Sequence, residues 1–98
     1  MTASINKYGD SIHKYDIQNQ IIYTLEVINK ILINNNFSFE NIVRSFAYFK
    51  EKRSSSYFKK LLNEDAFIDF PVILIEDITI CREELLFEIE IDAIKVEK

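Results

Sequence analysis

The sequence contains very few of the residues that break regular structure or cross-link a chain. Its 98 residues include one glycine, one proline, one cysteine and one histidine, and no tryptophan. A single glycine excludes the glycine-rich loops that hold phosphates. One cysteine cannot form an internal disulfide, so a reducing, cytoplasmic compartment is expected. The lone histidine, His13, has no residues at ligand spacing around it, so no metal site is predicted and His13 is interpreted as a loop residue.

Long apolar runs and concentrated positive charge are also missing. No stretch approaches the roughly 20 apolar residues that a membrane-spanning helix needs, and the polar N-terminus predicts no signal peptide. The net charge is −4, and the 12 basic residues are dispersed rather than gathered in one stripe. We therefore expect no membrane partner, no nucleic-acid partner and no cofactor.

The residues that are present suffice for one small core. Hydrophobic residues make up 48% of the chain, with eight phenylalanines and five tyrosines. This length fits a single domain over residues 1–98. Because so small a core buries little surface, oligomerisation would help to stabilise it. Residues 1–15 are ambiguous, since they fit either a short edge strand or a loose arm.

The stretch Pro71–Lys98 is predicted to be the centre of the fold. Its pattern predicts two strands, at about Val72–Ile80 and Leu85–Val96, joined at a short turn. Both are rich in β-branched and aromatic residues. Alternation in the second strand separates an apolar face from an acidic one. The two sets are Leu85, Phe87, Ile89, Ile91 and Ala93 against Glu88, Glu90 and Asp92.

Two helices and a further strand are predicted upstream. Apolar residues recur at steps of three and four over Asp16–Asn36, with Asp16 as the N-cap. A second helix is expected from Ser54 or Ser55 to about Asn63. Between the helices, Ile42–Lys50 alternates as a strand. Its two faces are Val43, Ser45, Ala47 and Phe49 against Arg44, Phe46, Tyr48 and Lys50.

This order of elements predicts an α+β domain of two layers, with two helices on one face of a small mixed β-sheet. The opposite face of the sheet is too aromatic for an ordinary solvated surface and too charged for a core. We interpret that face as a subunit interface.

Several segments resemble one protein family in order and spacing. Thr24–Leu32, Phe39–Val43, Tyr57–Phe58, Phe70–Pro71 and Glu88–Ile94 are similar to the RidA (YjgF/YER057c/UK114) superfamily. Within it, the stretch Ile80–Glu90, with Cys81-Arg82 followed by Glu88-Ile89-Glu90, is most similar to the C-terminal half of chorismatases, and Ser11–Gln20 resembles their run before the first helix. The resemblance covers the chain from about Ser11 on. It implies a RidA/chorismatase-like fold and a homotrimer.

The resemblance also implies site residues. Glu88 matches a glutamate that faces the ligand pocket; it protonates the substrate for loss of pyruvate in chorismatases and orders the hydrolytic water in RidA-type deaminases. Cys81 matches a pocket cysteine of chorismatases, and Arg82 follows it. Lys50 lies where chorismatases have an arginine, and Arg44 adds a cation on the same strand face. We expect Glu88 to be catalytic and the other four residues to bind substrate.

Two departures from the family limit what it implies. The arginine that grips the substrate carboxylate in RidA proteins is replaced here by Ile73, which disfavours ordinary imine deamination. The chain also lacks the initial β-hairpin of RidA proteins and the N-terminal half of chorismatases. Either another chain completes the site, or the chain has no site of this kind.

The residues themselves leave the role of the acidic face open. A glutamate is a useful general acid when its pKa rises towards working pH. Crowding by Glu90 and Asp92, or burial at an interface, acts in that direction, whereas a nearby arginine lowers the pKa. The alternative is a solvated carboxylate stripe that prevents edge pairing. Cys81 is equally a small buried hydrophobe, and Arg82 an exposed turn residue.

Three functional hypotheses follow. The first is a chorismatase-like enzyme that releases pyruvate from chorismate or a related enolpyruvyl carboxylate, with Glu88 as the general acid. The second is a non-catalytic RidA-like module that binds a small carboxylate between subunits. The third is an accessory subunit of a longer partner.

Overall fold

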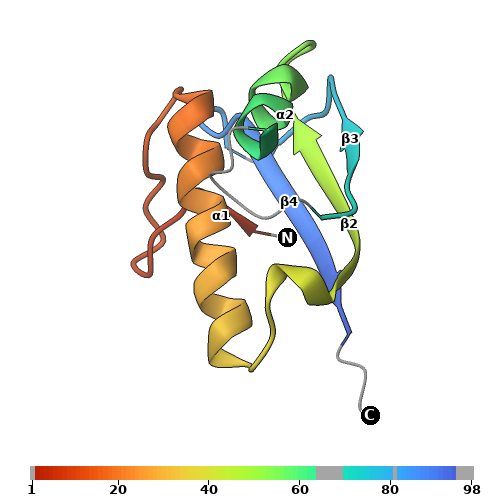
Figure 1. Cartoon of the computed structure of the whole chain (residues 1–98). Coiled ribbons are helices and arrows are strands. Elements are labelled where there is room, and N and C mark those ends of the chain that lie inside the picture. The colour runs from red at the N-terminus through yellow and green to blue at the C-terminus, as the bar shows by residue number, and fades with distance from the viewer. Residues whose placement is uncertain (1, 64–69, 81, 95–98) are drawn as a thin grey trace.

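The computed structural model describes residues 2–63, 70–80 and 82–94. Its two helices cover one face of a four-stranded mixed sheet with strand order β1-β4-β2-β3 (Figure 1). The predicted α+β fold of two layers is therefore confirmed. Within the described residues, neither helix is long and apolar enough to span a membrane. The elements are β1 (Thr2–Ala3), α1 (Ile17–Asn34), a 3₁₀ turn (Phe39–Asn41), β2 (Ile42–Phe49), α2 (Ser55–Asn63), β3 (Ile73–Ile75) and β4 (Phe87–Ala93).

Helix α1 follows its predicted boundaries closely. The Asp16 side chain accepts a hydrogen bond from the Asn19 backbone N–H at 3.2 Å, which confirms the predicted N-cap. The helix ends at Asn34, and Asn36 has a φ of 62°, a left-handed conformation that asparagine tolerates. The apolar stripe of the helix is buried against the sheet, as expected for residues at helical spacing. Its buried apolar members are Ile21, Leu25, Ile28 and Leu32.

Helix α2 begins where the serine run predicted, but a distant carboxylate satisfies its first N–H. The Glu76 side chain accepts a hydrogen bond from the Ser55 backbone N–H at 3.0 Å. This bond is the main reason that the pKa of Glu76 is lowered. The acceptor is 21 residues away in sequence. A cap of this kind depends on tertiary structure, so local sequence rules do not reveal it.

Strand β2 lies in the middle of the sheet, antiparallel to β4 and parallel to β3. Ser45, Ala47 and Phe49 are buried on the helix-facing side, as predicted. The predicted inward position of Val43 is wrong: this side chain is 52% exposed, whereas Ile42 is buried. The pairing with β4 shifts register between Ile42 and Arg44. A bulge of this kind turns the extra residue away from its expected face.

The predicted hairpin of two long C-terminal strands is also wrong. The first strand is only Ile73–Ile75, and β2 separates it from β4. The chain between β3 and β4 crosses the end of β2, where the Ile78 N–H donates to Phe49 O and the Lys50 N–H donates to Leu86 O. Alternation identified both segments as strands. It could not show that the long antiparallel pairing of β4 is made with β2.

Of the two alternatives left open for residues 1–15, the structure has an edge strand, but only over Thr2–Ala3, which pairs antiparallel with β4. A turn then follows in which Gly9 has a φ of 84° and the Asn6 side chain accepts hydrogen bonds from the N–H groups of Tyr8 and Asp10. This short edge strand covers only a small part of β4.

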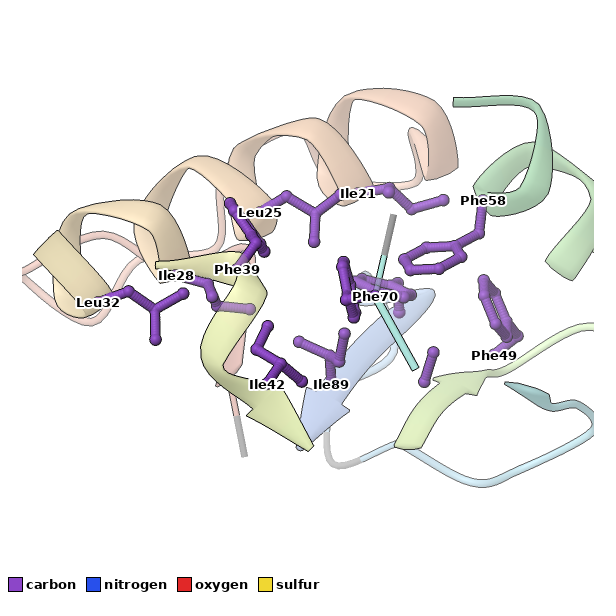
Figure 2. Packing of buried hydrophobic residues seen from close by; sticks show 12 residues of the cluster. Ile21, Leu25, Ile28, Leu32, Phe39, Ile42, Phe49, Phe58, Phe70 and Ile89 are labelled. Atoms are coloured by element: carbon purple, nitrogen blue, oxygen red, sulfur yellow. The ribbon is translucent and has the colours of Figure 1, made fainter. Parts of the chain in front are cut away.

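The core fills the space between α1, α2 and the sheet, as Figure 2 shows. At its upper end, the Phe58 ring of α2 lies 6.1 Å from the rings of Phe49 and Phe70 and 5.8 Å from that of Phe87, centroid to centroid. At the other end of the core, Ile28 and Leu32 of α1 belong to the same cluster and lie at the left in Figure 2. The beginning of β4 is thus held in an aromatic cluster.

Candidate functional site around Glu88

The sheet face that the helices leave uncovered carries the predicted site. On β4 it presents the carboxylates, and on β2 it presents Arg44, Phe46 and Tyr48, because each set alternates with buried neighbours. Strand β3 adds Ile73 and Ile75, which lie beside Phe46 and Tyr48. We call this the outer face. It is the polar and aromatic surface that the alternation of the sequence predicted.

Glu88 lies in the upper half of the outer face. It pairs with Tyr48 across β2 and with Ala3 across β1, so strands flank it on both sides. The side chain is half-buried, and this burial raises the pKa of Glu88 above its ordinary value. The sequence suggested crowding by Glu90 and Asp92, a nearby arginine, or burial as causes of a shifted pKa. Of these three, burial is the cause that shifts the pKa of Glu88. Burial therefore favours the protonated form of Glu88 relative to that of a fully exposed glutamate.

Tyr48 is a site residue that sequence reasoning placed on the face but gave no role. Its hydroxyl donates a hydrogen bond to the Glu90 carboxylate at 3.2 Å. Burial raises the pKa of Tyr48, and the bond to Glu90 and the charges of Glu90 and Glu88 raise it further. The phenol therefore stays a protonated donor beside the carboxylates.

Arg44 occupies the opposite end of the outer face. Its Nη2 and Nε lie 2.6 and 2.9 Å from one oxygen of Asp92, and its guanidinium lies 5.9 Å from the centre of the Phe46 ring. Asp92 is four residues along β4 from Glu88, or about 13 Å at the rise of an extended strand. Arg44 and Glu88 are thus not brought together within one chain.

Lys50 is the predicted cation that the register brings nearest to Glu88. Its backbone N–H donates to Leu86 O, which lies two residues before Glu88 on β4. Its Nζ donates to Glu83 O at 2.7 Å. A side chain held by one backbone carbonyl at the protein surface can exchange that partner for a carboxylate at little cost.

Arg82 is engaged with the N-terminal loop. Its Nη1 donates to Gly9 O at 2.8 Å and to Ser11 Oγ at 3.0 Å, while Ser11 Oγ donates to the Glu84 carboxylate at 2.9 Å. This network binds the loop to the segment before β4. Cys81, the remaining predicted site residue, lies outside the described residues.

A buried glutamine that the sequence did not single out fixes the start of β4. Gln20 of α1 has no exposed surface. Its amide donates to His13 O at 2.9 Å and to Glu84 O at 2.8 Å, and its Oε1 accepts from the Leu86 N–H at 2.8 Å. Two of these three bonds are long-range, and they hold the backbone at Glu84 and Leu86, just before Glu88. Its only sequence signal is a polar residue on an apolar helix stripe.

The described residues contain no cluster of three or more His, Cys, Asp or Glu side chains that could hold a metal ion. Three hollows lie beside the sheet, and Glu88 lines none of these three. Two of them flank Arg44 at the lower end of the outer face.

Comparisons with known proteins reveal the fold but no close relative. No protein-family model and no curated protein matches the sequence. Among solved structures, the Rid-family protein YyfB of unknown function from Yersinia pestis is similar, with 18% identity, a TM-score of 0.75, and coverage of 94% of this chain and 72% of that chain. A YjgF/YER057c/UK114 family member from Mycobacterium tuberculosis has 20% identity, a TM-score of 0.73 and coverage of 94% and 72%. Escherichia coli TdcF with bound serine has 15% identity, a TM-score of 0.73 and coverage of 97% and 76%.

These similarities are at the level of the backbone, since fewer than one residue in four is shared. The chain has the fold of RidA proteins, and the resemblance predicted from the sequence is confirmed to that extent.

Proposed function

We propose that this chain binds a small carboxylate at Glu88 and that Glu88 acts as a general acid. The observation that supports this most is the half-buried Glu88 side chain, whose pKa is raised by burial. A carboxylic acid whose pKa approaches working pH is an effective proton donor. The fold is that of a protein that carries bound serine, which is itself a small carboxylate.

In its most specific form, the proposed reaction is pyruvate release from chorismate or a related enolpyruvyl carboxylate. Glu88 donates its proton to the methylene carbon of the enol ether, and water adds to the resulting cation. One proton of the water returns to Glu88. The carbon–oxygen bond of the adduct then breaks as the remaining hydroxyl proton moves to the departing oxygen, which gives pyruvate and the alcohol. No oxidant, metal or cofactor is needed for this hydrolysis.

Lys50 is the residue that we assign to the substrate carboxylate. Its backbone N–H donates to Leu86 O, two residues before Glu88, and its Nζ has a backbone carbonyl as its partner. Arg44 is neutralised by Asp92, and Arg82 is bound to the N-terminal loop. Arg44 and Arg82 remain secondary proposals as binding residues, as does Cys81.

The test is an assay of pyruvate formation from chorismate, coupled to lactate dehydrogenase. We expect release by the wild-type chain, loss in Glu88→Gln, and a normal rate in Glu26→Gln, which makes the same change on the exposed side of α1. The rate should fall as pH rises through the raised pKa of Glu88, because the acid form is lost. Folded protein that releases no pyruvate, or an active Glu88→Gln variant, would rule out the enzyme.

Binding without turnover is the second candidate. Ile73 takes the place where RidA proteins have a carboxylate-binding arginine, and its side chain is 55% exposed on the outer face. A ligand held by Lys50 and Glu88 alone would be bound without being activated for imine chemistry. Serine and 2-oxo acids should then raise the melting temperature of the wild type but not of Lys50→Met. Absence of any shift would exclude both this candidate and the enzyme.

We further propose that the outer face is covered by other copies in a homotrimer, which would enclose Glu88. Three exposed apolar side chains flank the Arg44–Asp92 pair, and such a patch is typical of an interface. They are Val43, Ile73 and Ile94. Light scattering coupled to size exclusion should give a trimer. A monomer, or co-purification of a longer chain, would instead favour the accessory-subunit hypothesis.

A further inference from the structure

A different surface of the molecule, away from the outer face, has the features of a protein-binding edge. Strand β1 pairs with β4 only at Ile89 and Glu88, although β4 continues to Ala93. Among the described residues, no other strand pairs with Ile91–Ala93 on the side away from β2. The lower half of β4 is therefore a sheet edge.

The backbone groups that this edge presents follow from the hydrogen bonds to β2. Leu86 O accepts from Lys50 N, and Ile94 N donates to Asn41 O, so both residues direct their groups towards β2. Backbone groups alternate in direction along a strand. The N–H and C=O groups of Ile91 and Ala93 therefore point towards the free edge, where an added strand would meet them.

An apolar groove of about 220 Å³ runs below this edge, between α1 and β4. It is lined by Ile28, Ile31 and Leu32 of the helix and by Ile89, Ile91 and Ala93 of the strand. Ile31 is 50% exposed, which is unusual for an isoleucine on the core side of a helix. Side chains on the inner face of an added strand would fill this groove.

The other face of an added strand would meet the carboxylates of Glu90 and Asp92. Because Asp92 is ion-paired with Arg44, the uncompensated negative charge there is chiefly that of Glu90. Glu90 and Asp92 alternate with Ile91 and Ala93 and point to the outer face, and Glu90 also borders the groove. Directly opposed residues of an antiparallel pair lie on the same face of the sheet, so basic side chains would face these two carboxylates. An added strand should therefore alternate apolar residues, which face the groove, with basic residues, which face the carboxylates.

We propose that the Ile91–Ala93 edge binds an extended segment of another polypeptide, in which apolar residues alternate with lysine or arginine. The segment adds as a strand to β4 and inserts its apolar side chains into the groove against α1. This is recognition by strand addition, in which backbone bonds provide affinity and alternate side chains provide selectivity. The proposal does not depend on any ligand at Glu88.

A second copy of this edge is a poor occupant. If two β4 strands paired antiparallel about Asp92, the two Asp92 side chains would be directly opposed. If they paired about Ile91, each Glu90 would oppose an Asp92. Like charges placed opposite one another destabilise a strand pair. The acidic side chains thus oppose self-pairing and favour a basic partner.

The test uses the synthetic peptide acetyl-Lys-Ile-Lys-Val-Lys-Ile-amide and amide hydrogen exchange followed by NMR. Without peptide, the amides of Ile91 and Ala93 should exchange faster than those of Glu90 and Asp92, which point towards β2. With peptide, the first pair should become protected and the second pair should change little. The same peptide with glutamate in place of lysine should bind less tightly.

Matched variants of the chain locate the contact. Ile31→Glu should weaken binding about tenfold or more, because it places a charge in the apolar groove. Ile33→Glu is the control, since Ile33 is 59% exposed on the same helix and does not line the groove. Ile31→Ser repeats the test with a milder change. Glu90→Lys should weaken binding of the lysine peptide about threefold, the effect of one cross-strand charge pair.

Three results would overturn the proposal. The first is that the lysine peptide gives no protection of Ile91 and Ala93 at millimolar concentration. The second is that Ile31→Glu and Ile33→Glu weaken binding equally. The third is that these amides become protected in the free protein as its own concentration rises, which would identify a second copy as the occupant.

Discussion

The two ends of strand β4 are held in very different ways. At the beginning of the strand, Gln20 and Lys50 fix the backbone of Leu86, and the Phe87 ring is fully buried beside Phe49 and Phe58. At the other end, Ile94 is 57% exposed, and one side of the strand is a free edge. We call the segment at Leu86 and Phe87 the fixed end of β4 and the segment from Ile91 to Ile94 its open end.

The two ends of β4 are therefore suited to different functions. A group that transfers a proton must be held in position and shielded from water, and Glu88 follows directly after the fixed segment. A surface that takes up another chain needs unpaired backbone groups and accessible apolar side chains, and the open end offers both.

The first prediction compares apolar truncations at the two ends. Phe87→Ala should lower the free energy of unfolding by about 3–5 kcal/mol, because it leaves a cavity between two phenylalanine rings. Ile91→Ala should cost about 1–2 kcal/mol, because that side chain is only partly buried. Urea denaturation of both variants gives the comparison. Equal losses would show that the open end belongs to the core as fully as the fixed end.

The second prediction concerns the buried amide. Gln20→Leu keeps the volume but leaves Leu86 N without its partner and removes bonds to His13 O and Glu84 O. Unsatisfied buried backbone groups should lower stability by about 2–4 kcal/mol. Gln18→Leu is the control, since Gln18 is exposed on the same helix. If the two variants were equally stable, Gln20 would not be what fixes this end of β4.

The third prediction is a difference in pH dependence between two glutamates. Glu84 accepts hydrogen bonds from its own backbone N–H and from Ser11, which lower its pKa. The stability that Glu84 contributes is present above its unfolded-state pKa and is lost as pH falls through its lower folded-state pKa. The raised pKa of Glu88 has the opposite sign, so the folded state gains stability as pH falls through it.

Melting temperatures measured from neutral pH down to about pH 3 should reveal both effects. Glu84→Gln should reduce the loss of stability on acidification. Glu88→Gln should stabilise the chain near neutral pH and make the loss on acidification steeper. Identical pH profiles for the two variants would contradict the assignment of opposite shifts.

The fourth and smallest effect concerns the open end alone. The Arg44–Asp92 pair is exposed, with 65% and 51% of the two side chains accessible. In the isolated chain, a double-mutant cycle with alanine at both positions should give a coupling of about 0.2–1 kcal/mol, and salt should reduce it. A coupling several times larger that resists salt would mean that this end is enclosed in the native assembly.

The sequence was sufficient for features that depend on neighbours along the chain. The spacing of Ile21, Leu25, Ile28 and Leu32 predicted α1, and the alternation around Ala47 and Ile89 predicted the two faces of the sheet. The Asp16 cap is local as well. Each of these depends on contacts within a few residues or on a simple period.

Features that depend on distant partners could not be predicted in this way. The placement of β2 between β3 and β4, the capping of α2 by Glu76 and the bonds of Gln20 to Glu84 and Leu86 all join segments far apart in sequence. The same holds for the candidate site. Resemblance indicated Glu88, but the partners of Arg44 and Arg82 follow from strand pairing and from the N-terminal loop.

The most direct test of the account is the titration of the Glu88 side chain in the folded chain, followed by NMR of its labelled carboxyl carbon. The account predicts a pKa above the ordinary glutamate value of about 4.3, lowered when Phe87→Ala loosens the fixed end of β4 and admits water. A pKa at or below the ordinary value would contradict it, because Glu88 would then be an ionised surface carboxylate with no proton to donate.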